Sequence, residues 1–401
     1  MAGFSPRTNN GGSHEGFAGK KVGVGKVIPF DRPQWSPSEE LAQAEELGRE
    51  AFDTPVATLE SRLGFVFGRA RSLVVPTPSI ALYLVMAGLG IGEGDEVIAS
   101  PFSWFQMARA VAWRNATLTV SDIDSWSFTL DPEKAARKIT PRTRLLLVSN
   151  TLGHPADWDR FEALAREKGV ALVEDATESL FSEYRGRRTG SFGDVSILAF
   201  GAPHPNLGES YAAILTDRED LDLLFRTLRG GTPSSLPPGT PPILPLELSV
   251  PPGLARLALR SLTRLPGGIK KRALILDAYQ ESMRSFEGVK DLYQSPQADR
   301  VNWFAYMVHL GTRFSVLSRN AIVDDLAGAG IGARPFPPPL HLHPWFQARG
   351  MRKGLAPVAE KLAERAIALP LHPGMTQDEA AAIAERFKEA ASNVGAGAAI
   401  Y

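Results

Sequence analysis

The sequence predicts an α/β protein built around a mostly parallel, buried sheet. Stretches with the spacing of amphipathic helices alternate with short strands, and several of these strands are apolar on both faces. Such strands are typical of parallel sheets covered by right-handed helical crossovers. The 401 residues, of which 44% are hydrophobic and 22% charged, suit one large domain and one smaller domain.

The elements of the large domain are predicted from hydrophobic periodicity. Helical spacing begins at residues 39–52 and 57–67. Beyond them we expect helices at 79–89, 104–113 and 157–168, and strands at 72–76, 96–100, 118–121, 144–149 and 171–174. Residues 197–216 are predicted to form a strand, a loop and a second strand.

The small domain begins after a change in composition. Pro and Gly are dense over 230–252 and interrupt the alternation, so we assign 31–250 to the large domain and 251–401 to the small one. There we expect a mainly helical stretch at 254–283 with an interruption at Pro266-Gly267-Gly268, strand-like residues at 303–318, and helices at 319–328 and 376–392.

Composition limits the kinds of ligand. Lys plus Arg and Asp plus Glu both number 44, so neither nucleic acid nor an anionic membrane is indicated as a partner. The absence of cysteine excludes disulfides, thiolate nucleophiles, and cysteine-ligated zinc or iron–sulfur sites. The first residues are polar and Gly-rich without an apolar run, so we expect a flexible tail over 1–30 and a cytoplasmic protein.

The first candidate site motif is VVPTPSIALYL at 74–84, a short strand followed by a helix. Thr77 suits the N-cap, Pro78 suits the first helical position, and Ser79 adds a hydroxyl beside the outward N–H groups. A helix start of this kind can bind an anion. It can equally be a plain strand-to-helix turn.

The second motif is LVEDATES at 172–179, where an apolar strand ends in Glu174 and Asp175. Ligands of parallel α/β sheets bind at the C-terminal strand ends. A carboxylate there can hold a pyridinium nitrogen protonated and so strengthen an electron sink. Taken alone, Asp175 can also be a helix or turn cap.

The third motif is the loop GAPHPNLGES at 201–210. His204 stands between Pro203 and Pro205, which restrict the backbone and would fix the imidazole in place. A single loop histidine also has ordinary structural explanations. This motif therefore indicates a functional site only together with the other two motifs.

In the order and spacing of these motifs the chain resembles the DegT/DnrJ/EryC1/StrS aminotransferase family over nearly its whole length. The similarity includes ALYLVMAGLGIGEGDEVI at 81–98, DIDSWSFTLDP at 122–132, ITPRTRLLLVSNTLGHPADWD at 139–159, YRGRRTGSFGDVS at 184–196, GIGARPFPPPLHLHP at 330–344 and AERAIALPLHPGMT at 363–376. The resemblance implies a fold-type-I transferase that depends on pyridoxal phosphate (PLP), with a seven-stranded-type, mostly parallel sheet in the large domain and a small α+β C-terminal domain.

The resemblance also implies site roles. Trp104 matches the aromatic residue that stacks on the cofactor ring, Asp175 the acid that faces the pyridine nitrogen, and Glu178 a position near the ring hydroxyl. The family's phosphate turn falls on Thr77, Pro78 and Ser79. Two chains are expected to pair as a homodimer, and the substrate is expected to be a nucleotide keto-sugar in polysaccharide or secondary-metabolite biosynthesis.

Several residues depart from the family pattern. His204 stands at the position of the cofactor-binding lysine, and no lysine occurs between Lys168 and Lys270. An internal Schiff base needs a primary amine, which imidazole lacks. Ala199 replaces a phosphate-contacting serine, and Ser210-Tyr211 adds bulk to a glycine turn. The family's Asn-Tyr-Arg-like motif is not evident before Leu246.

These departures leave alternative functions open. The chain can be similar to the ketosugar 3-dehydratases, which use pyridoxamine phosphate (PMP) without a tether and a histidine for proton transfer; without cysteine it would be a relative that needs no iron–sulfur cluster. It can instead be a non-catalytic homologue that binds a sugar nucleotide or a partner. A transaminase that uses Lys270 or Lys271, and a metal pair at His341 and His343, are weaker alternatives.

Overall fold

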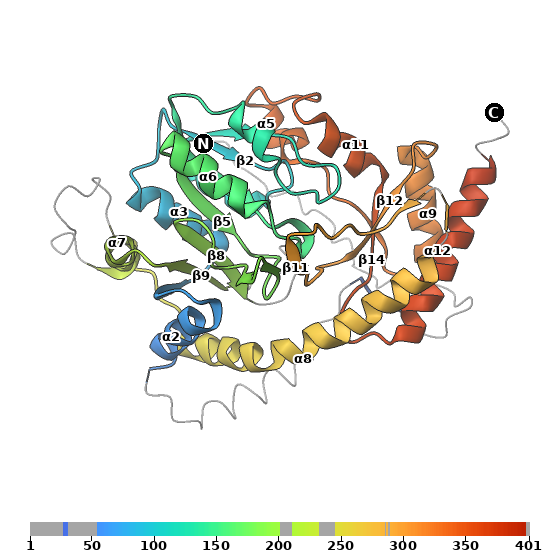
Figure 1. Ribbon diagram of the computed structural model, residues 1–401, viewed down its shortest axis with the longest axis horizontal. Coiled ribbons are helices and arrows are strands. Elements are labelled where there is room, and N and C mark those ends of the chain that lie inside the picture. Colours follow the sequence, from blue (N-terminus) through green and yellow to red (C-terminus); the bar gives the residue numbers. More distant parts are fainter. Residues whose placement is uncertain are drawn as a thin grey trace, which may run out of the picture.

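The computed structural model describes residues 27–30, 54–200, 211–231, 245–284, 286–287 and 289–397. A sheet of seven strands, in the order β1-β9-β8-β5-β4-β2-β3, forms the centre of the first part of the chain (Figure 1). Its strands are β1 (Arg71–Val75), β2 (Glu96–Ala99), β3 (Thr117–Val120), β4 (Thr143–Ser149), β5 (Ala171–Asp175), β8 (Val195–Phe200) and β9 (Tyr211–Thr216). Within it only β9 runs antiparallel to its neighbours. The predicted fold class is therefore confirmed.

Helices cover both faces of this sheet, which explains why its strands are apolar on both sides. They are α3 (Pro78–Gly88), α4 (Phe105–Trp113), α5 (Pro132–Ala136), α6 (Trp158–Lys168) and α7 (Glu219–Gly230). In β4, Leu145 and Leu147 pack in one apolar cluster with α3, α4 and α7, whereas Leu146 and Val148 pack in another with α5 and α6. Alternate residues of one strand thus contribute to two cores.

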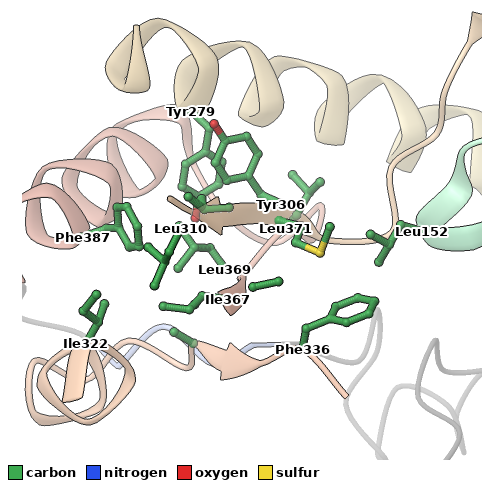
Figure 2. Close-up of a cluster of buried hydrophobic side chains, with 14 of the residues drawn as sticks. Leu152, Tyr279, Tyr306, Leu310, Ile322, Phe336, Ile367, Leu369, Leu371 and Phe387 are labelled. Carbon is green, nitrogen blue, oxygen red and sulfur yellow. The ribbon is translucent and has the colours of Figure 1, made fainter. Parts of the chain in front are cut away.

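The second part of the chain carries a smaller, antiparallel sheet. Its four strands lie in the order β10-β12-β14-β13, namely β10 (Val289–Lys290), β12 (Tyr306–Leu310), β14 (Ala366–Leu369) and β13 (Arg334–Pro335). The helices around it are α9 (Val316–Gly328), α10 (Pro344–Gln347), α11 (Pro357–Arg365) and α12 (Gln377–Gly397). Figure 2 shows its core, where Tyr279 stacks on Tyr306 beside Leu369 and Phe387. The strand-like stretch predicted at 303–318 is shorter than expected, because α9 already begins at Val316.

Helix α8 (Pro252–Met283) is one continuous element, so the predicted interruption at Pro266-Gly267-Gly268 is wrong. Pro266 is exposed, and packing at both ends of the helix outweighs its missing N–H. The first half packs with α2 (Pro55–Phe67) in one apolar cluster, and Tyr279 packs in the core of the small sheet. Figure 1 shows α8 passing beneath both sheets.

A third sheet lies between the two larger ones. It joins β11 (Ala298–Arg300) to the hairpin of β6 (Glu183–Tyr184) and β7 (Arg187–Arg188). Arg185 and Arg187 of this hairpin form ion pairs with Asp159 and Glu162 at 2.9 and 3.0 Å. Arg185 and Arg187 are therefore paired with acids on the surface of this hairpin.

One edge of the seven-stranded sheet carries the candidate residues. Strands β1, β2, β4, β5 and β8 all end at this edge, because β1 and β8 both run opposite to β9, and β8 runs parallel to β5. The predicted helix at 39–52 lies outside the described residues. No helix in the described ranges is both long and apolar enough to cross a membrane.

Candidate active site

Asp175 ends β5 as a buried acid with 2% of its surface exposed. Its Oδ2 accepts a hydrogen bond from Ser149 Oγ at 3.0 Å. Its Oδ1 accepts from the backbone N and Oγ1 of Thr177 at 3.2 and 2.7 Å. Burial raises the pKa of Asp175 despite these bonds. All three donor groups are neutral, so the carboxyl lies in a polar setting without a compensating cation among the described residues.

Glu178 lies one turn further along the chain and faces the same region. Its Oε2 accepts from Leu152 N at 2.7 Å, and the Trp104 indole also acts on the carboxyl as a donor. Glu178 as a whole residue is half-buried, but its carboxyl group is enclosed by protein atoms. Burial, followed by the charge of Asp175, raises the pKa of Glu178 to about 8. Glu178 is therefore protonated at neutral pH and able to donate a hydrogen bond.

Short polar contacts connect the loops that carry these residues. Ser103 Oγ lies 3.1 Å from Ser149 Oγ, which donates to Asp175. Ser103 directly precedes Trp104, whose ring centroid lies 6.4 Å from that of Phe304. The structure thus brings Trp104, from the loop after β2, together with Asp175 and Glu178, from the end of β5 and the loop that follows it, at the predicted sheet edge.

Glu174, the neighbour of Asp175, has a different role. It is fully buried and accepts from Asn150 Nδ2, Gly190 N, Phe192 N and Ser196 Oγ at 2.7 to 2.9 Å. These donors tie the segment before β8 to β5. Successive residues of a strand point to opposite faces, so one acid of the pair anchors the fold and the other faces the site.

The start of α3 is capped as predicted, but its hydroxyls are engaged within the protein. Thr77 Oγ1 accepts from Ile80 N at 3.2 Å. Ser79 is 2% exposed, and its Oγ donates to Gln106 O at 2.8 Å. Pro78 has no N–H. The Ser79 N–H is therefore the first-turn donor that remains for an anion within the described part of the chain.

His204 lies outside the described residues, as does the whole stretch Gly201 to Ser210. The residues on either side of this stretch are described. Phe200 ends β8 and Tyr211 begins β9, and the two are cross-strand partners at the edge that carries Asp175. Ala199 lies within β8.

Three groups of the site were not predicted from the sequence. Ser103 and Ser149 support Asp175, and the backbone N–H of Leu152, which has a φ of 57°, supports Glu178. The apolar strand ending in Ser149-Asn150 was a usable signal for Ser149, because its end lies beside that of β5. Nothing local in the sequence indicates the Leu152 backbone conformation.

The remaining candidates have structural partners. His341 is buried and its Nε2 lies 2.8 Å from Glu360 Oε1, whereas His343 caps α10 by accepting from Trp345 N. No group of three or more potential ligands in the described ranges could hold a metal ion. Lys270 and Lys271 are exposed on α8.

Two known proteins have sequences similar to most of this chain. Spore coat polysaccharide biosynthesis protein SpsC of Bacillus subtilis (strain 168) is 26% identical over 383 residues, which cover 90% of this chain and 96% of SpsC. GDP-perosamine synthase of Caulobacter vibrioides is 30% identical over 302 residues, which cover 74% of this chain and 79% of that enzyme.

Solved structures agree with the fold. S. venezuelae DesV in complex with a ketimine intermediate superposes with a TM-score of 0.81 and 26% identity, over 91% of this chain and 98% of DesV. Spr1654 from Streptococcus pneumoniae in its PLP-form gives a TM-score of 0.83 at 23% identity, over 92% of this chain and 100% of Spr1654. The family profile itself matches residues 39–388. The chain therefore belongs to the DegT/DnrJ/EryC1/StrS aminotransferase family.

Proposed function

We propose that the protein binds PLP or PMP without a covalent bond and acts on a nucleotide-linked keto-sugar in polysaccharide or secondary-metabolite biosynthesis. The chemistry would be that of a ketosugar dehydratase rather than of a lysine-based transaminase. His204 would move a proton at the reacting carbon, and the working unit would be a cytoplasmic homodimer. The observation that carries the proposal is the pair of carboxyl groups at Asp175 and Glu178, which have no cation beside them among the described residues.

The acids fit the ring end of the cofactor. Asp175 would hold a protonated pyridine nitrogen, because a buried carboxylate with only neutral donors is stabilised by a cationic ligand. Glu178, protonated at neutral pH, would donate to an oxygen on the ring. Trp104 would pack against the ring face. When bound, such a cofactor supplies an electron sink for a carbanion.

The phosphate end fits less fully. Ser79 Oγ is occupied by Gln106 O and Thr77 Oγ1 by Ile80 N. The backbone N–H of Ser79 and the positive end of α3 would still favour an anion. Affinity for the cofactor would therefore depend mainly on the ring.

His204 suits proton transfer. With histidine in place of the family's lysine, the cofactor would have no Schiff base to the protein at this position. The nearest lysines in the sequence are Lys168 and Lys270. Imidazole titrates near pH 6.5, which matches a group that takes and returns a proton at neutral pH. Spr1654 is known in a PLP-form and a PMP-form, so a member of this fold is able to hold either.

A non-catalytic sugar-nucleotide-binding homologue is the second candidate. The internal bond of Ser79 and the replacement of serine by Ala199 favour it. In that case the protein would bind a sugar nucleotide or a partner subunit, and the buried acids would be remnants of an ancestral site.

The test separates binding, tethering and turnover. PLP and PMP are titrated calorimetrically into the purified protein, followed by borohydride treatment and mass spectrometry. We expect saturable binding of PMP and no cofactor fixed to any lysine. His204→Asn should bind PMP within about threefold of wild type yet turn over nucleotide 4-keto-sugars at least about 100-fold more slowly.

His343→Asn is the matched control, because His343 is exposed and asparagine retains its N-cap role. It should leave binding and turnover unchanged. Cofactor fixed to a lysine by borohydride would contradict the proposal, as would full activity of His204→Asn. Failure to bind either cofactor form would favour the non-catalytic homologue.

A further inference from the structure

An exposed tryptophan stands on a rigid turn beside the candidate site. Trp126 is 51% exposed. Its backbone is nevertheless fixed, because Asp124 Oδ1 accepts from Trp126 N, Ser127 N and Ser127 Oγ at 3.0, 2.8 and 3.0 Å. These bonds also engage the Asp124 carboxylate. A large indole held in water by an ordered turn is a feature of binding surfaces.

A second ring and a cation from the small sheet adjoin this indole. Tyr293, 37% exposed, has its ring centroid 5.7 Å from that of Trp126. Lys290 Nζ lies 4.2 Å from the centre of the Trp126 ring. We call Trp126, Tyr293 and Lys290 the aromatic–basic surface. Lys290 is paired across the sheet with His309, and burial together with the charges of Lys290 and Arg365 lowers the pKa of His309 to about 4. Lys290 is thus the cation that lies against the rings.

A chain of rings leads from this surface to the candidate active site. Tyr293 stacks on His154 at 6.4 Å with an interplanar angle of 16°, and His154 lies 5.8 Å from Trp303. Trp303 is followed by Phe304, which contacts Trp104. Trp104 in turn donates to Glu178, so a series of neighbouring side chains connects the surface to Glu178.

The imidazole of His154, which stacks on Tyr293, is hydrogen-bonded at both nitrogens. His154 Nδ1 donates to Pro155 O at 2.7 Å, and Nε2 accepts from Ser295 N at 3.0 Å. This assignment follows from the backbone N–H at Nε2, which requires an acceptor there. The bond from Ser295 fixes the segment that carries Tyr293. The aromatic–basic surface is therefore ordered in the absence of a ligand.

We propose that the aromatic–basic surface binds the nucleoside diphosphate part of the substrate, with the base on Trp126 and Tyr293 and the phosphates near Lys290. Planar bases stack favourably on aromatic side chains, and an ammonium group attracts phosphate. The proposal rests on the proposed function, since it places the nucleotide end of the keto-sugar at this surface and the sugar end at Asp175. It needs neither a bound cofactor nor turnover.

The experiment uses UDP, GDP and dTDP as probes, without any sugar, titrated calorimetrically into the full-length protein. At least one should bind, and Trp126→Ala should weaken it about tenfold or more. Lys290→Ala should weaken it severalfold and flatten its dependence on salt. Trp113→Ala is the matched control, because Trp113 is similarly exposed at 49% but lies on α4. It should have no effect.

Three results would overturn the proposal. They are the absence of diphosphate binding, equal affinities for Trp126→Ala and wild type, and a change of oligomeric state in Trp126→Ala without a change in nucleotide affinity. The last result would make the surface a contact between copies of the chain. Cofactor titration of the same variants reports separately on the proposed function, because loss of PMP binding would leave the nucleotide result intact.

Discussion

The ring end and the phosphate end of the candidate cofactor site differ in what their side chains already contact. At the ring end, Asp175 and Glu178 carry buried carboxyl groups that are held by neutral donors. At the phosphate end, the hydroxyls of Thr77 and Ser79 are bonded to the protein's own backbone. The first end is electrostatically incomplete without a ligand, whereas the second is satisfied without one.

This difference indicates which end dominates binding. A buried carboxylate without a cation costs free energy that a cationic ligand restores. A hydroxyl that already donates to a carbonyl gains little by exchanging that partner for phosphate. On the proposed function, the ring end would therefore provide most of the free energy of cofactor binding, and the phosphate end would contribute less.

Asp175→Asn should have the largest effect and is the sharpest test of the ring end. Asparagine can keep the Thr177 bonds through Oδ1, and Ser149 can accept from its Nδ2 while donating to Ser103. The charge is lost while the shape is kept. We expect PMP affinity to fall at least about 30-fold, as for truncation of a buried charge pair, measured by calorimetry.

Asp175→Asn should lower PMP affinity but should not lower the thermal stability of the protein without cofactor. Because Asp175 is buried and no described residue places a cation beside it, its neutral replacement should leave thermal stability unchanged or higher at pH 8, measured by calorimetric unfolding. A variant that is simply misfolded would lose both stability and affinity. Unchanged PMP affinity would contradict the assignment of Asp175 to the pyridine nitrogen.

Much of the framework was predictable because it depends on local patterns. The alternation of apolar strands and amphipathic helices reflects burial of both sheet faces, as the divided packing of Leu145 and Leu146 shows. The apolar strand before it predicted that Asp175 lies at the C-terminal edge of the sheet, and Asp175 indeed ends β5. The cap at Thr77 followed from residue type alone.

Other features depend on residues distant in sequence and could not be predicted. The raised pKa of Glu178 reflects the Leu152 backbone and the proximity of Asp175. The bond from Ser79 to Gln106 joins the starts of two helices. Helix α8 continues through Pro266 because both halves pack against other elements. For His204, only the sheet positions of Phe200 and Tyr211 are known.

Glu178→Gln should have an intermediate effect, seen in the pH dependence of stability. The folded pKa of Glu178, about 8, lies above its ordinary value of 4.5. Its contribution to stability is therefore fully present below pH 4.5 and is lost as pH rises through about 8. Between pH 6 and 9 the free energy of unfolding of the wild type without cofactor should fall by on the order of 1 kcal/mol more than that of Glu178→Gln, measured by chemical denaturation.

The matched control for this titration is Glu183→Gln, which alters an exposed hairpin ion pair with Arg300 and not the site. Its stability should follow that of the wild type across the same pH range. Parallel curves for wild type and Glu178→Gln would show that Glu178 is already ionised at neutral pH. It would then be unable to donate to a ring oxygen.

Ser79→Ala should have the smallest effect and is the test of the phosphate end. The hydroxyl donates to Gln106 O in a buried setting, so its removal leaves a carbonyl without this partner and should cost about 1 kcal/mol of stability. Thr77→Ala, which removes the cap of the same helix, should cost about the same. Because neither hydroxyl needs to reach the ligand, both variants should bind PMP within about threefold of wild type, in contrast to Asp175→Asn. A tenfold loss of affinity in Ser79→Ala with unchanged unfolding would mean that the hydroxyl leaves Gln106 to bind phosphate, and the two ends of the site would then contribute on comparable terms.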